Sequence, residues 1–354
     1  MKLIVFLAIM SLSAFADVTR SQLDAIAKRD GWTFSYNAQN ANKVGKDWPT
    51  GYYKKPYSGP VTSLGVGEKL KSWDLDNFKH NRVATKDQGQ CGSCVIFSFI
   101  WNFEESLALR HLDVPLLSPQ HLMSCGSGDQ CNGAYGEEIA ADLVRLKQLH
   151  TLADYPYTAR TSSCKTVSGK LYGQIESYQT IDGSARSILS ALHNGQPVSV
   201  GIAATNSFGS YSGGVYNACD SMGVNHYVVI SALDCESAVD KDGYCQFDAK
   251  GELPAGVGVV TVQNSWGNDF GVNGQIKMKL TKKNGQRCLN IAGEQGDAQV
   301  LNIGAPMPED KPVSFVLESD AAKLDVLWKP NSGYTAEDAK RALQKALDAV
   351  KGRR

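Results

Sequence analysis

The hydrophobic pattern of the chain changes from helical to strand-like about halfway along its length. Residues 94–109 are apolar on every face of the first turns, which predicts a buried helix. Residues 136–148 carry apolar positions at three- and four-residue spacings, which predicts a second helix. Ser118 followed by Pro119 is typical of a further helix start.

Strand signals take over from about residue 196. Runs rich in β-branched residues predict strands near 197–200, 227–230, 256–262 and 274–280. Helices followed by strands indicate an α+β chain.

Residues 305–354 form a separate C-terminal extension in this pattern. Prolines at its start indicate a linker, and short strands are predicted at 314–318 and 323–329. Thr335 begins a predicted amphipathic helix that runs to about Val350. Such a helix either packs on its own domain or binds a partner, and the pattern leaves this choice open.

The N-terminus has the three parts of an export signal. Lys2 provides the positive charge, residues 3–13 the apolar segment and Ala14-Phe15-Ala16 the cleavage site, so residues 1–16 are predicted to be removed. No second run of about 18 apolar residues follows. We therefore expect an exported protein that is secreted, periplasmic or directed to an acidic vacuolar or lysosomal compartment.

Composition excludes some classes of partner. The chain has 354 residues, of which 36 are basic and 36 acidic, so its formal net charge is zero. This balance gives no electrostatic reason to expect binding to nucleic acid or to an anionic membrane surface. A hydrophobic fraction of 42% is sufficient for one large core or for two lobes.

Cys94 is the strongest candidate for a catalytic residue. It stands at the start of the predicted buried helix, after Gly92 and Ser93, which suit a turn and an N-cap. The N–H groups and the macrodipole at a helix N-terminus stabilise a thiolate, the nucleophilic form of cysteine. The same turn brings Gln88 close to the sulfur, where its amide can stabilise an oxyanion.

A nucleophile of this kind needs a base and a group that orients the base. His226 lies where a loop enters a predicted strand, 132 residues after Cys94. Asn264 lies where another predicted strand ends at a turn. We expect the remaining histidines to be surface or structural residues; they are His80, His111, His121, His150 and His193.

Cys91 and Cys94 also form a CxxC motif, which supports a second chemical interpretation. In an exported protein this motif is compatible with a thiol–disulfide oxidoreductase, but that function leaves Gln88, His226 and Asn264 without a role. A zinc site is excluded because no second CxxC pair occurs at ligand spacing. We therefore predict no metal and no cofactor.

Three separate segments carry a resemblance to the papain-like (C1) family of cysteine peptidases, which includes the cathepsins. They are residues 88–98, 223–230 and 259–267, and the resemblance spans roughly residues 70–300. It implies a two-lobed α+β fold with a helical N-terminal lobe and an antiparallel β-barrel-like C-terminal lobe. The active-site cleft would lie between the two lobes.

The resemblance also implies a role for each motif residue. Cys94 would be the nucleophile, and His226 the acid/base that shares its proton in a thiolate–imidazolium pair. Asn264 would accept a hydrogen bond from the imidazole and fix its orientation. Gln88 and the N–H of Cys94 would form the oxyanion hole, and Trp266 would shield the His–Asn hydrogen bond from water.

The same resemblance divides the rest of the chain. Residues 17–68 would be a propeptide that lies along the cleft and blocks it, or else an N-terminal extension that stays attached. Residues 69–304 would form the peptidase domain, followed by the C-terminal extension. The blocking segment would then be an intramolecular inhibitor.

Nine cysteines leave one over if the others pair. Cysteine spacing alone does not fix the pairing. The family pattern implies the disulfides Cys91–Cys131, Cys125–Cys164 and Cys219–Cys288. Cys235 and Cys245 would then close a local loop in a segment that looks inserted between His226 and Asn264.

The resemblance places the substrate-binding residues at Gly133, Ala134, Gly201, Asn225 and Tyr227. Val95 stands where the family usually has an aromatic residue, and Tyr227 where it often has a small one. We expect Tyr227 to narrow the pocket for the second substrate residue before the cut (P2), with Gly201 partly restoring room and Gly293 near its floor. The P2 preference should therefore be altered.

The function implied is that of an exported cysteine endopeptidase made as a zymogen, which cuts peptide bonds through a Cys94 thioester with His226 as acid/base. The histidine pair of a dipeptidase-like occluding loop is absent between Cys91 and Cys164, which favours an endopeptidase. Its partners would be protein or peptide substrates. The alternative is a catalytically weak homologue that acts as a peptide-binding or inhibitory protein.

Overall fold

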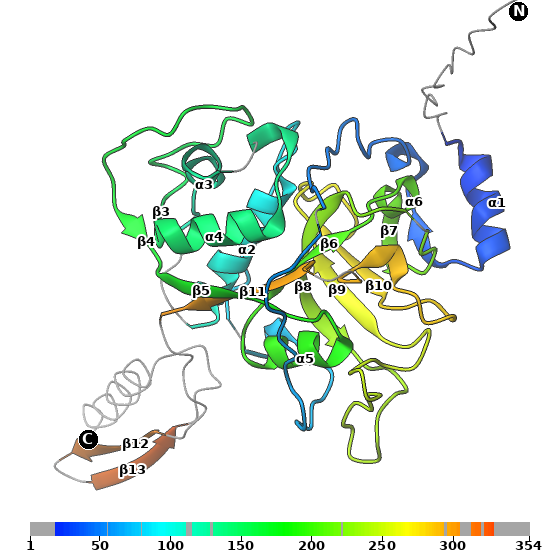
Figure 1. The fold of residues 1–354 in the computed structure, drawn as a ribbon. Coiled ribbons are helices and arrows are strands. Elements are labelled where there is room, and N and C mark those ends of the chain that lie inside the picture. Colours follow the sequence, from blue (N-terminus) through cyan, green and yellow to red (C-terminus); the bar gives the residue numbers. More distant parts are fainter. Residues whose placement is uncertain are drawn as a thin grey trace, which may run out of the picture.

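The computed structural model describes residues 18–304, except 55, 79, 111–114, 128–129, 221 and 294–295, and two strands of the C-terminal extension (Figure 1). The predicted export signal at 1–16 and the predicted helix from Thr335 to Val350 lie outside the described residues. The two strands are β12 (Val313–Ser319) and β13 (Ala322–Trp328), and they pair with each other in antiparallel fashion, as the sequence predicts.

A seven-stranded antiparallel sheet is the largest element of the fold. Its strand order is β10-β9-β8-β6-β11-β5, and a short strand, β2, pairs with β8. The bounds are β2 (Trp73–Asp74), β5 (Ile175–Thr180), β6 (Val198–Ile202), β8 (His226–Asp234), β9 (Val259–Gln263), β10 (Gln275–Lys279) and β11 (Ala298–Ile303). The pairing ends at β10 and at β5, so the barrel-like sheet is open rather than a closed barrel.

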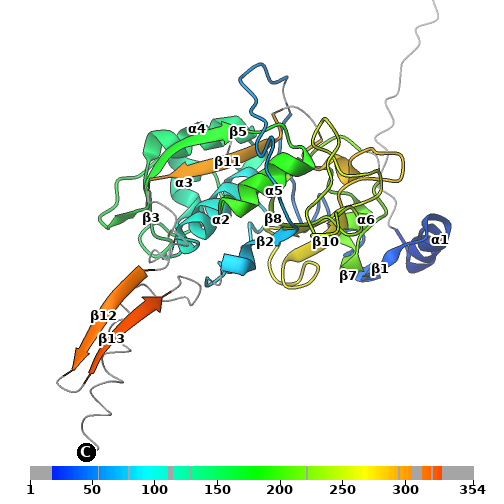
Figure 2. The ribbon, with the colours of Figure 1, turned by 90° about the horizontal axis from the view of Figure 1, so that it is seen from below.

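The helices of the described residues are distributed around this sheet: α2, α3 and α4 lie together at one end, and α1 and α6 lie at the other (Figures 1 and 2). They are α1 (Arg20–Asp30), α2 (Cys94–Ala108), α3 (Pro119–Cys125), α4 (Gly136–Leu146), α5 (Ala185–His193) and α6 (Asn206–Gly209). Short 3-10 turns occupy 38–40, 75–78, 130–132 and 288–290, and the small strands are β1 (Thr33–Tyr36), β3 (Leu149–His150), β4 (Leu171–Tyr172) and β7 (Tyr211–Val215). Within the described part of the chain, no helix is both long and apolar enough to cross a membrane.

The buried residues form two cores, one for each lobe. One core lies between α2, α3 and α4, and the other lies around the sheet and α5. The lobes do not follow the order of the sequence, because Ile175 of β5 and Leu301 and Ile303 of β11 pack in the helical core. Trp48 and Phe34, from the N-terminal part of the chain, pack in the sheet core.

Helix α2 joins the lobes and is buried along its whole length except at Ala108. An all-round buried helix must satisfy its polar side chains internally. Ser98 Oγ donates to the carbonyl of Val228 in β8 at 3.0 Å, and Asn102 Nδ2 donates to Ser199 Oγ in β6 at 3.0 Å. These bonds fix the rotation of α2 against the sheet. The apolar residues between them, such as Phe99, contribute about 1.5–3 kcal/mol each on burial.

Residues 18–68 pack on both lobes. Helix α1 begins at a capping box between Thr19 and Gln22 and ends at Gly31, whose φ of 62° suits glycine. Strand β1 then pairs with β7, and Phe34 packs between Tyr211 and Tyr216 of the β lobe. The sequence pattern did not predict α1 or β1.

Four disulfides connect the cysteines as the resemblance implies: Cys91–Cys131, Cys125–Cys164, Cys219–Cys288 and Cys235–Cys245. All nine cysteines lie in described residues, and Cys94 is the one without a disulfide. Cys91 is bonded to Cys131 rather than to its CxxC neighbour, which argues against the oxidoreductase interpretation. Each crosslink restricts the unfolded chain and typically contributes about 2–4 kcal/mol.

A buried histidine in the helical lobe makes stability depend on pH. His121 of α3 is 9% exposed, and its Nδ1 accepts the N–H of His150 at 3.1 Å. Burial, and secondly the nearby His150, lower the pKa of His121 to about 4. An unfolded histidine has a pKa of about 6.5. Between pH 6.5 and pH 4 this residue therefore binds a proton in the unfolded chain but not in the folded one. Stability is therefore lost as the pH falls from about 6.5 to about 4.

We expect the His121→Gln variant to lose less stability on acidification, because it removes the group that must be buried uncharged. Between pH 7 and pH 4.5 the difference from the parent should be roughly 2 kcal/mol. The measurement is urea unfolding with disulfides intact, in a Cys94→Ala background that prevents self-cleavage. His193→Gln, at a half-buried position on α5, controls for the loss of a histidine. Equal losses in parent and His121→Gln would contradict the assignment.

Candidate active site

Cys94 is the first residue of α2 and is completely buried. Backbone N–H groups of Tyr227 and Gly51 lie within hydrogen-bonding reach of its sulfur, together with those at the start of α2. Ser93 holds the N-cap position, but its side chain makes no capping bond and its hydroxyl pairs with Tyr157 Oη at 2.9 Å. The N–H groups at the helix N-terminus therefore remain directed at the sulfur.

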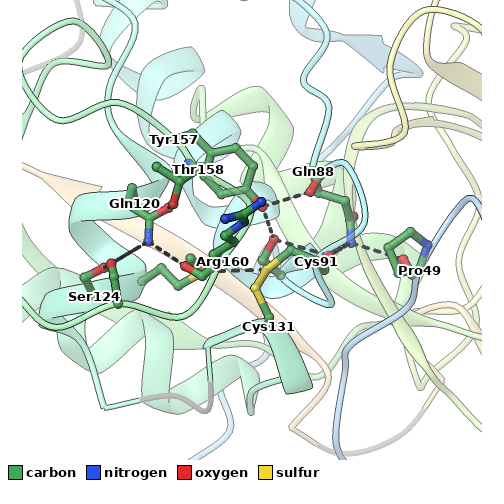
Figure 3. The surroundings of a disulfide bond; sticks show 12 residues. Pro49, Gln88, Cys91, Gln120, Ser124, Cys131, Tyr157, Thr158 and Arg160 are labelled. Carbon is green, nitrogen blue, oxygen red and sulfur yellow. Dashed lines mark hydrogen bonds between the residues drawn. A yellow bond between two sulfur atoms is a disulfide. The ribbon is translucent and has the colours of Figure 1, made fainter.

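Gln88 lies between the Cys91 turn and residue Pro49 (Figure 3). Its Nε2 donates to the carbonyls of Cys91 at 2.8 Å and of Pro49 at 3.1 Å. Its Oε1 accepts the hydroxyl of Ser265 at 2.7 Å, which fixes the amide with its N–H groups toward the cleft. Tyr157 Oη donates to the Gln88 carbonyl at 2.8 Å and holds the backbone of the turn.

A buried ion pair and a buried histidine–carboxylate contact position the segment that leads to Gln88. Lys86 Nζ lies 2.5 Å from Glu104 Oε2, and His80 Nε2 lies 2.7 Å from Glu105 Oε1. Both carboxylates belong to α2, so the chain that carries Gln88 is attached to the helix that carries Cys94. Loss of one partner from a buried pair costs about 3–5 kcal/mol, because the other charge is left uncompensated.

The β lobe contributes the histidine and its partners. His226 begins β8, and its Nε2 lies 2.7 Å from Asn264 Oδ1, which also accepts the N–H of Ser265 at 2.8 Å. The Trp266 ring stacks on the imidazole at 4.5 Å between centroids and covers this hydrogen bond. With Nε2 as the donor, Nδ1 is the basic nitrogen, and it has no hydrogen-bond partner among the described residues.

A segment of the same chain, Pro49–Tyr53, covers these groups. The Pro49 carbonyl accepts from Gln88 Nε2 at 3.1 Å and from Trp266 Nε1 at 3.2 Å. The Gly51 carbonyl accepts the N–H of Ala134 at 2.9 Å, and the N–H of Tyr53 returns to the Ala134 carbonyl at 3.0 Å. Tyr52 therefore pairs with Ala134 as a strand residue would.

The other wall of the cleft holds the same segment through Asn225. Its carbonyl accepts the N–H groups of Gly51 at 3.2 Å and Tyr52 at 3.1 Å. Gly133 leaves no room for a side chain, because a Cβ there would lie 2.8 Å from the Gly51 carbonyl and from the ring of Tyr53. Segment 49–53 is thus bound through its backbone by both lobes.

The ring of Tyr52 fills a pocket beside this backbone. Its centroid lies 4.8 Å from that of Tyr227, and a Cβ at Gly201 would lie 3.0 Å from its edge. Its hydroxyl donates to Asp297 Oδ1 at 2.5 Å, and Lys54 Nζ lies 2.7 Å from the same oxygen. Asp297, and not Gly293, therefore lies at the end of this pocket, while Gly293 packs against Arg287.

Comparison with known proteins is consistent with this geometry. The model of the papain family cysteine proteases matches residues 70–294. The chain belongs to this family. It is 31% identical to cysteine proteinase 3 of Dictyostelium discoideum over 56% of this chain and 56% of the relative. It is 28% identical to a viral cathepsin of Spodoptera litura multicapsid nucleopolyhedrovirus over 62% of this chain and 60% of the relative.

The chain thus matches little more than half the length of these two relatives. Among solved structures, a recombinant stem bromelain precursor has a similar fold, with a TM-score of 0.61 at 21% identity. That likeness covers 80% of this chain and 88% of the other. Papain-family membership therefore rests on the family model, and the likeness to the bromelain precursor supports the two-lobed fold.

The candidate site residues other than Gly293 stay predictions, and several of them contact the covering segment. The five candidate substrate-binding residues all contact segment 49–53; they are Gly133, Ala134, Gly201, Asn225 and Tyr227. Three features were missed from the sequence. Ser265 lies inside one of the motif segments without an assigned role, Asp297 has no motif around it, and the covering residues 49–53 were placed only within the expected propeptide.

Burial changes the protonation expected for the catalytic pair. Desolvation raises the pKa of Cys94 to about 12, although the surrounding N–H groups act in the opposite direction. Desolvation lowers the pKa of His226 to about 4, against the opposing effect of its bond to Asn264. In the covered cleft both groups are therefore neutral at pH 7, and the expected thiolate–imidazolium pair is not formed. The reason is that segment 49–53 excludes the water that would solvate the two charges.

We expect the Cys94 thiol of the uncut chain to react slowly with iodoacetamide at pH 7, at least about 100-fold below free cysteine, because only the thiolate is alkylated. Tyr52→Ala removes the ring that holds the covering segment and should raise the rate by at least ~10-fold. The rates are measured by peptide mapping after alkylation of the native protein.

Tyr53→Ala is the matched control, because this neighbouring ring is 43% exposed and lies outside the pocket. Cys94→Ser identifies any reaction at other sites. A wild-type rate equal to that of free cysteine, or equal acceleration by both tyrosine variants, would contradict the interpretation.

Proposed function

We propose that the chain is the precursor of an exported papain-like cysteine endopeptidase. The observation that carries the proposal is the arrangement of Gln88, Cys94 and His226 beneath a backbone-bound peptide segment, 49–53. A cleft that holds its own chain through backbone N–H and carbonyl groups is suited to any extended peptide. The groups that form and break bonds lie at the centre of that cleft.

In the first half of the proposed reaction, the Cys94 thiolate attacks the carbonyl carbon of the scissile bond. The carbonyl electron pair moves to oxygen, and the oxyanion is stabilised by Gln88 Nε2 and the N–H of Cys94. Collapse of this intermediate breaks the C–N bond. The leaving amine takes a proton from His226 Nδ1, and the acyl group remains on sulfur as a thioester.

Water completes the reaction. His226 Nδ1 accepts a proton as the water oxygen attacks the thioester, and the sulfur leaves as thiolate and restores the ion pair. Asn264 holds the imidazole throughout through the 2.7 Å bond to Nε2, and Trp266 keeps water from that bond. Ser265 positions Gln88, so the oxyanion hole is organised from the β lobe as well.

The proposed zymogen mechanism follows from how the covering segment is held. The Gly51 N–H donates to the Asn225 carbonyl at 3.2 Å, and the Pro49 carbonyl accepts from Gln88 and Trp266. The segment therefore occupies backbone-binding groups of the cleft and the proposed oxyanion donor, so a substrate cannot bind until it leaves. Stacking of Trp48 on Trp266 at 5.3 Å anchors the segment on the other side.

We propose residues 17–68 as the propeptide and 69–304 as the peptidase domain, with 1–16 as an export signal and 305–354 as an extension. Strand β1 of this segment pairs with β7 of the peptidase domain. This docking supports an inhibitory propeptide over a loose extension. A catalytically weak peptide-binding homologue is the less favoured alternative, because the chain keeps a residue suited to each role: Cys94, His226, Asn264 and Gln88.

Self-processing tests the proposed function. We expect the wild-type precursor, incubated with reductant between pH 4 and 8, to lose residues up to about 68 or 69. Cys94→Ala should stay intact, because it lacks the nucleophile. Mass spectrometry follows the size of both, and hydrolysis of a synthetic peptide measures activity. A wild-type chain that neither cuts itself nor cleaves peptide, even after its N-terminal segment is removed, would disprove the proposal.

The pocket occupied by Tyr52 makes the P2 preference a separate prediction. Tyr227 is fully buried, and its hydroxyl bonds to Gln299, so it forms a fixed wall of the pocket. Tyr227→Ala should broaden cleavage toward bulky P2 residues by several-fold in kcat/KM, because it removes that wall. A substrate library varied at P2 measures this, with Tyr178→Ala on the outer strand β5 as control. An unchanged P2 profile would refute it.

A further inference from the structure

Helix α2 differs at its start from the other described helices that follow a serine or threonine. In four of those helices the N-cap side chain accepts the backbone N–H three residues later, and the N-cap backbone is extended, with ψ between 113° and 169°. The four N-cap residues are Thr19, Ser118, Ser184 and Thr205. Ser93 makes no capping bond, and its ψ is 24°. Because serine is among the preferred N-cap residues, the uncapped start of α2 needs a physical cause.

Tyr157 provides this cause. Its Oη lies 2.9 Å from Ser93 Oγ and donates to the Gln88 carbonyl at 2.8 Å (Figure 3). A phenol has one hydrogen, so the Ser93 hydroxyl must be the donor of the second bond. The Ser93 side chain is therefore held at Tyr157, and it is not available to the N–H of Ile96, which a cap at this position would bind.

Tyr157 is itself fixed in position and in protonation. Its ring packs edge-on against that of Phe97 in α2, with 4.8 Å between the centroids. Burial raises the pKa of Tyr157 to about 12, so the phenol keeps its hydrogen at neutral and acidic pH. The bond that holds Ser93 is therefore present whatever the protonation of the catalytic pair.

The conformation of Ser93 determines where the N–H of Cys94 points. A peptide group is planar, so the ψ angle of one residue sets the orientation of the next N–H. With the ψ of a capped helix, the Cys94 N–H would turn through a large angle. This N–H lies within reach of the Cys94 sulfur and is one of the two proposed oxyanion donors. The other donor belongs to Gln88, whose carbonyl is held by the same Tyr157 hydroxyl.

We propose that Tyr157 is a positioning residue of the active site, whose hydroxyl keeps Ser93 from capping α2 and so directs the Cys94 N–H at the sulfur. The proposal rests on the proposed peptidase function, which makes Cys94 the nucleophile. Tyr157 acts through Ser93 and Gln88 rather than on the substrate. Without its hydroxyl, Ser93 is free to cap the helix as the other N-cap residues do, and the thiolate of Cys94 loses part of its stabilisation.

The test follows the Cys94 thiol in the full-length chain, in the Tyr52→Ala background that is expected to open the cleft. Its rate of alkylation by iodoacetamide is measured from pH 4 to 11 by peptide mapping. We expect Tyr157→Phe to shift this profile to higher pH, with rates roughly 3- to 10-fold lower on its rising part, because thiolate stabilisation at the helix N-terminus is weakened. If no plateau is reached, rates at one pH on the rising part give the same comparison.

Ser93→Ala supplies the rescue, because alanine has no side-chain acceptor with which to cap the helix. The double variant Tyr157→Phe, Ser93→Ala should return the profile to within about 2-fold of the parent rates. Tyr155→Phe is the matched control. Tyr155 is buried in the same lobe, but its hydroxyl accepts the N–H of Lys165 at 3.1 Å, so its loss should leave the profile in place.

Peptide hydrolysis by the self-processed chain, with Tyr52 retained, gives a second readout. Tyr157→Phe should lower kcat by about 10-fold with KM nearly unchanged, because the oxyanion donors act on the transition state and not on the bound substrate. Tyr155→Phe should leave both constants unchanged. Cooperative urea unfolding shows that each variant is folded.

An unshifted alkylation profile in Tyr157→Phe overturns the proposal. So does a shift that Ser93→Ala does not reverse, because Tyr157 would then act through general support of the turn. An equal shift in Tyr155→Phe overturns it as well. A wild-type chain that neither processes itself nor hydrolyses peptide overturns the proposed function instead. Alkylation requires no enzymatic activity, so the two failures are distinguished.

Discussion

Burial of helix α2 between the lobes is the constraint on which the rest of the structure depends. The helix has no solvent face over most of its length, and Ser98 and Asn102 bond to β8 and β6. These bonds set the rotation and height of α2 against the strand that begins at His226. The position of Cys94 relative to that strand therefore follows from core packing rather than from local loop structure.

In the proposed precursor, the same constraint lets one cleft serve inhibition and catalysis. Its walls are the backbone groups of Ala134 and Asn225, which bind any extended chain, and the covering segment uses them as a substrate would. Because that segment excludes water, it changes the protonation of Cys94 and His226 as well as blocking a substrate's access to them. The thiol and imidazole are held neutral until the segment leaves, so the covered site is protected against reaction with small electrophiles.

Much of the site could be predicted from local sequence. Cys94, His226 and Asn264 stand in short motifs at the ends of predicted elements, where catalytic side chains are commonly exposed to a cleft. The strands near residues 197–280 were found because β-branched runs mark buried strands. Strands β5 and β11 and helix α5 were not found, because their patterns are short and tertiary packing determines their type.

The sequence by itself determined the family resemblance, the chemical groups of the site and the one cysteine left for catalysis. Only the tertiary structure decided what lies over them, because residues 49–53 contact groups that are distant in sequence, for example Gly51 with Ala134 and Asn225. It also decided the protonation of Cys94 and His226, since burial depends on every element around them. Local sequence patterns do not show which distant residues pack together. The desolvation of a buried group depends on that packing.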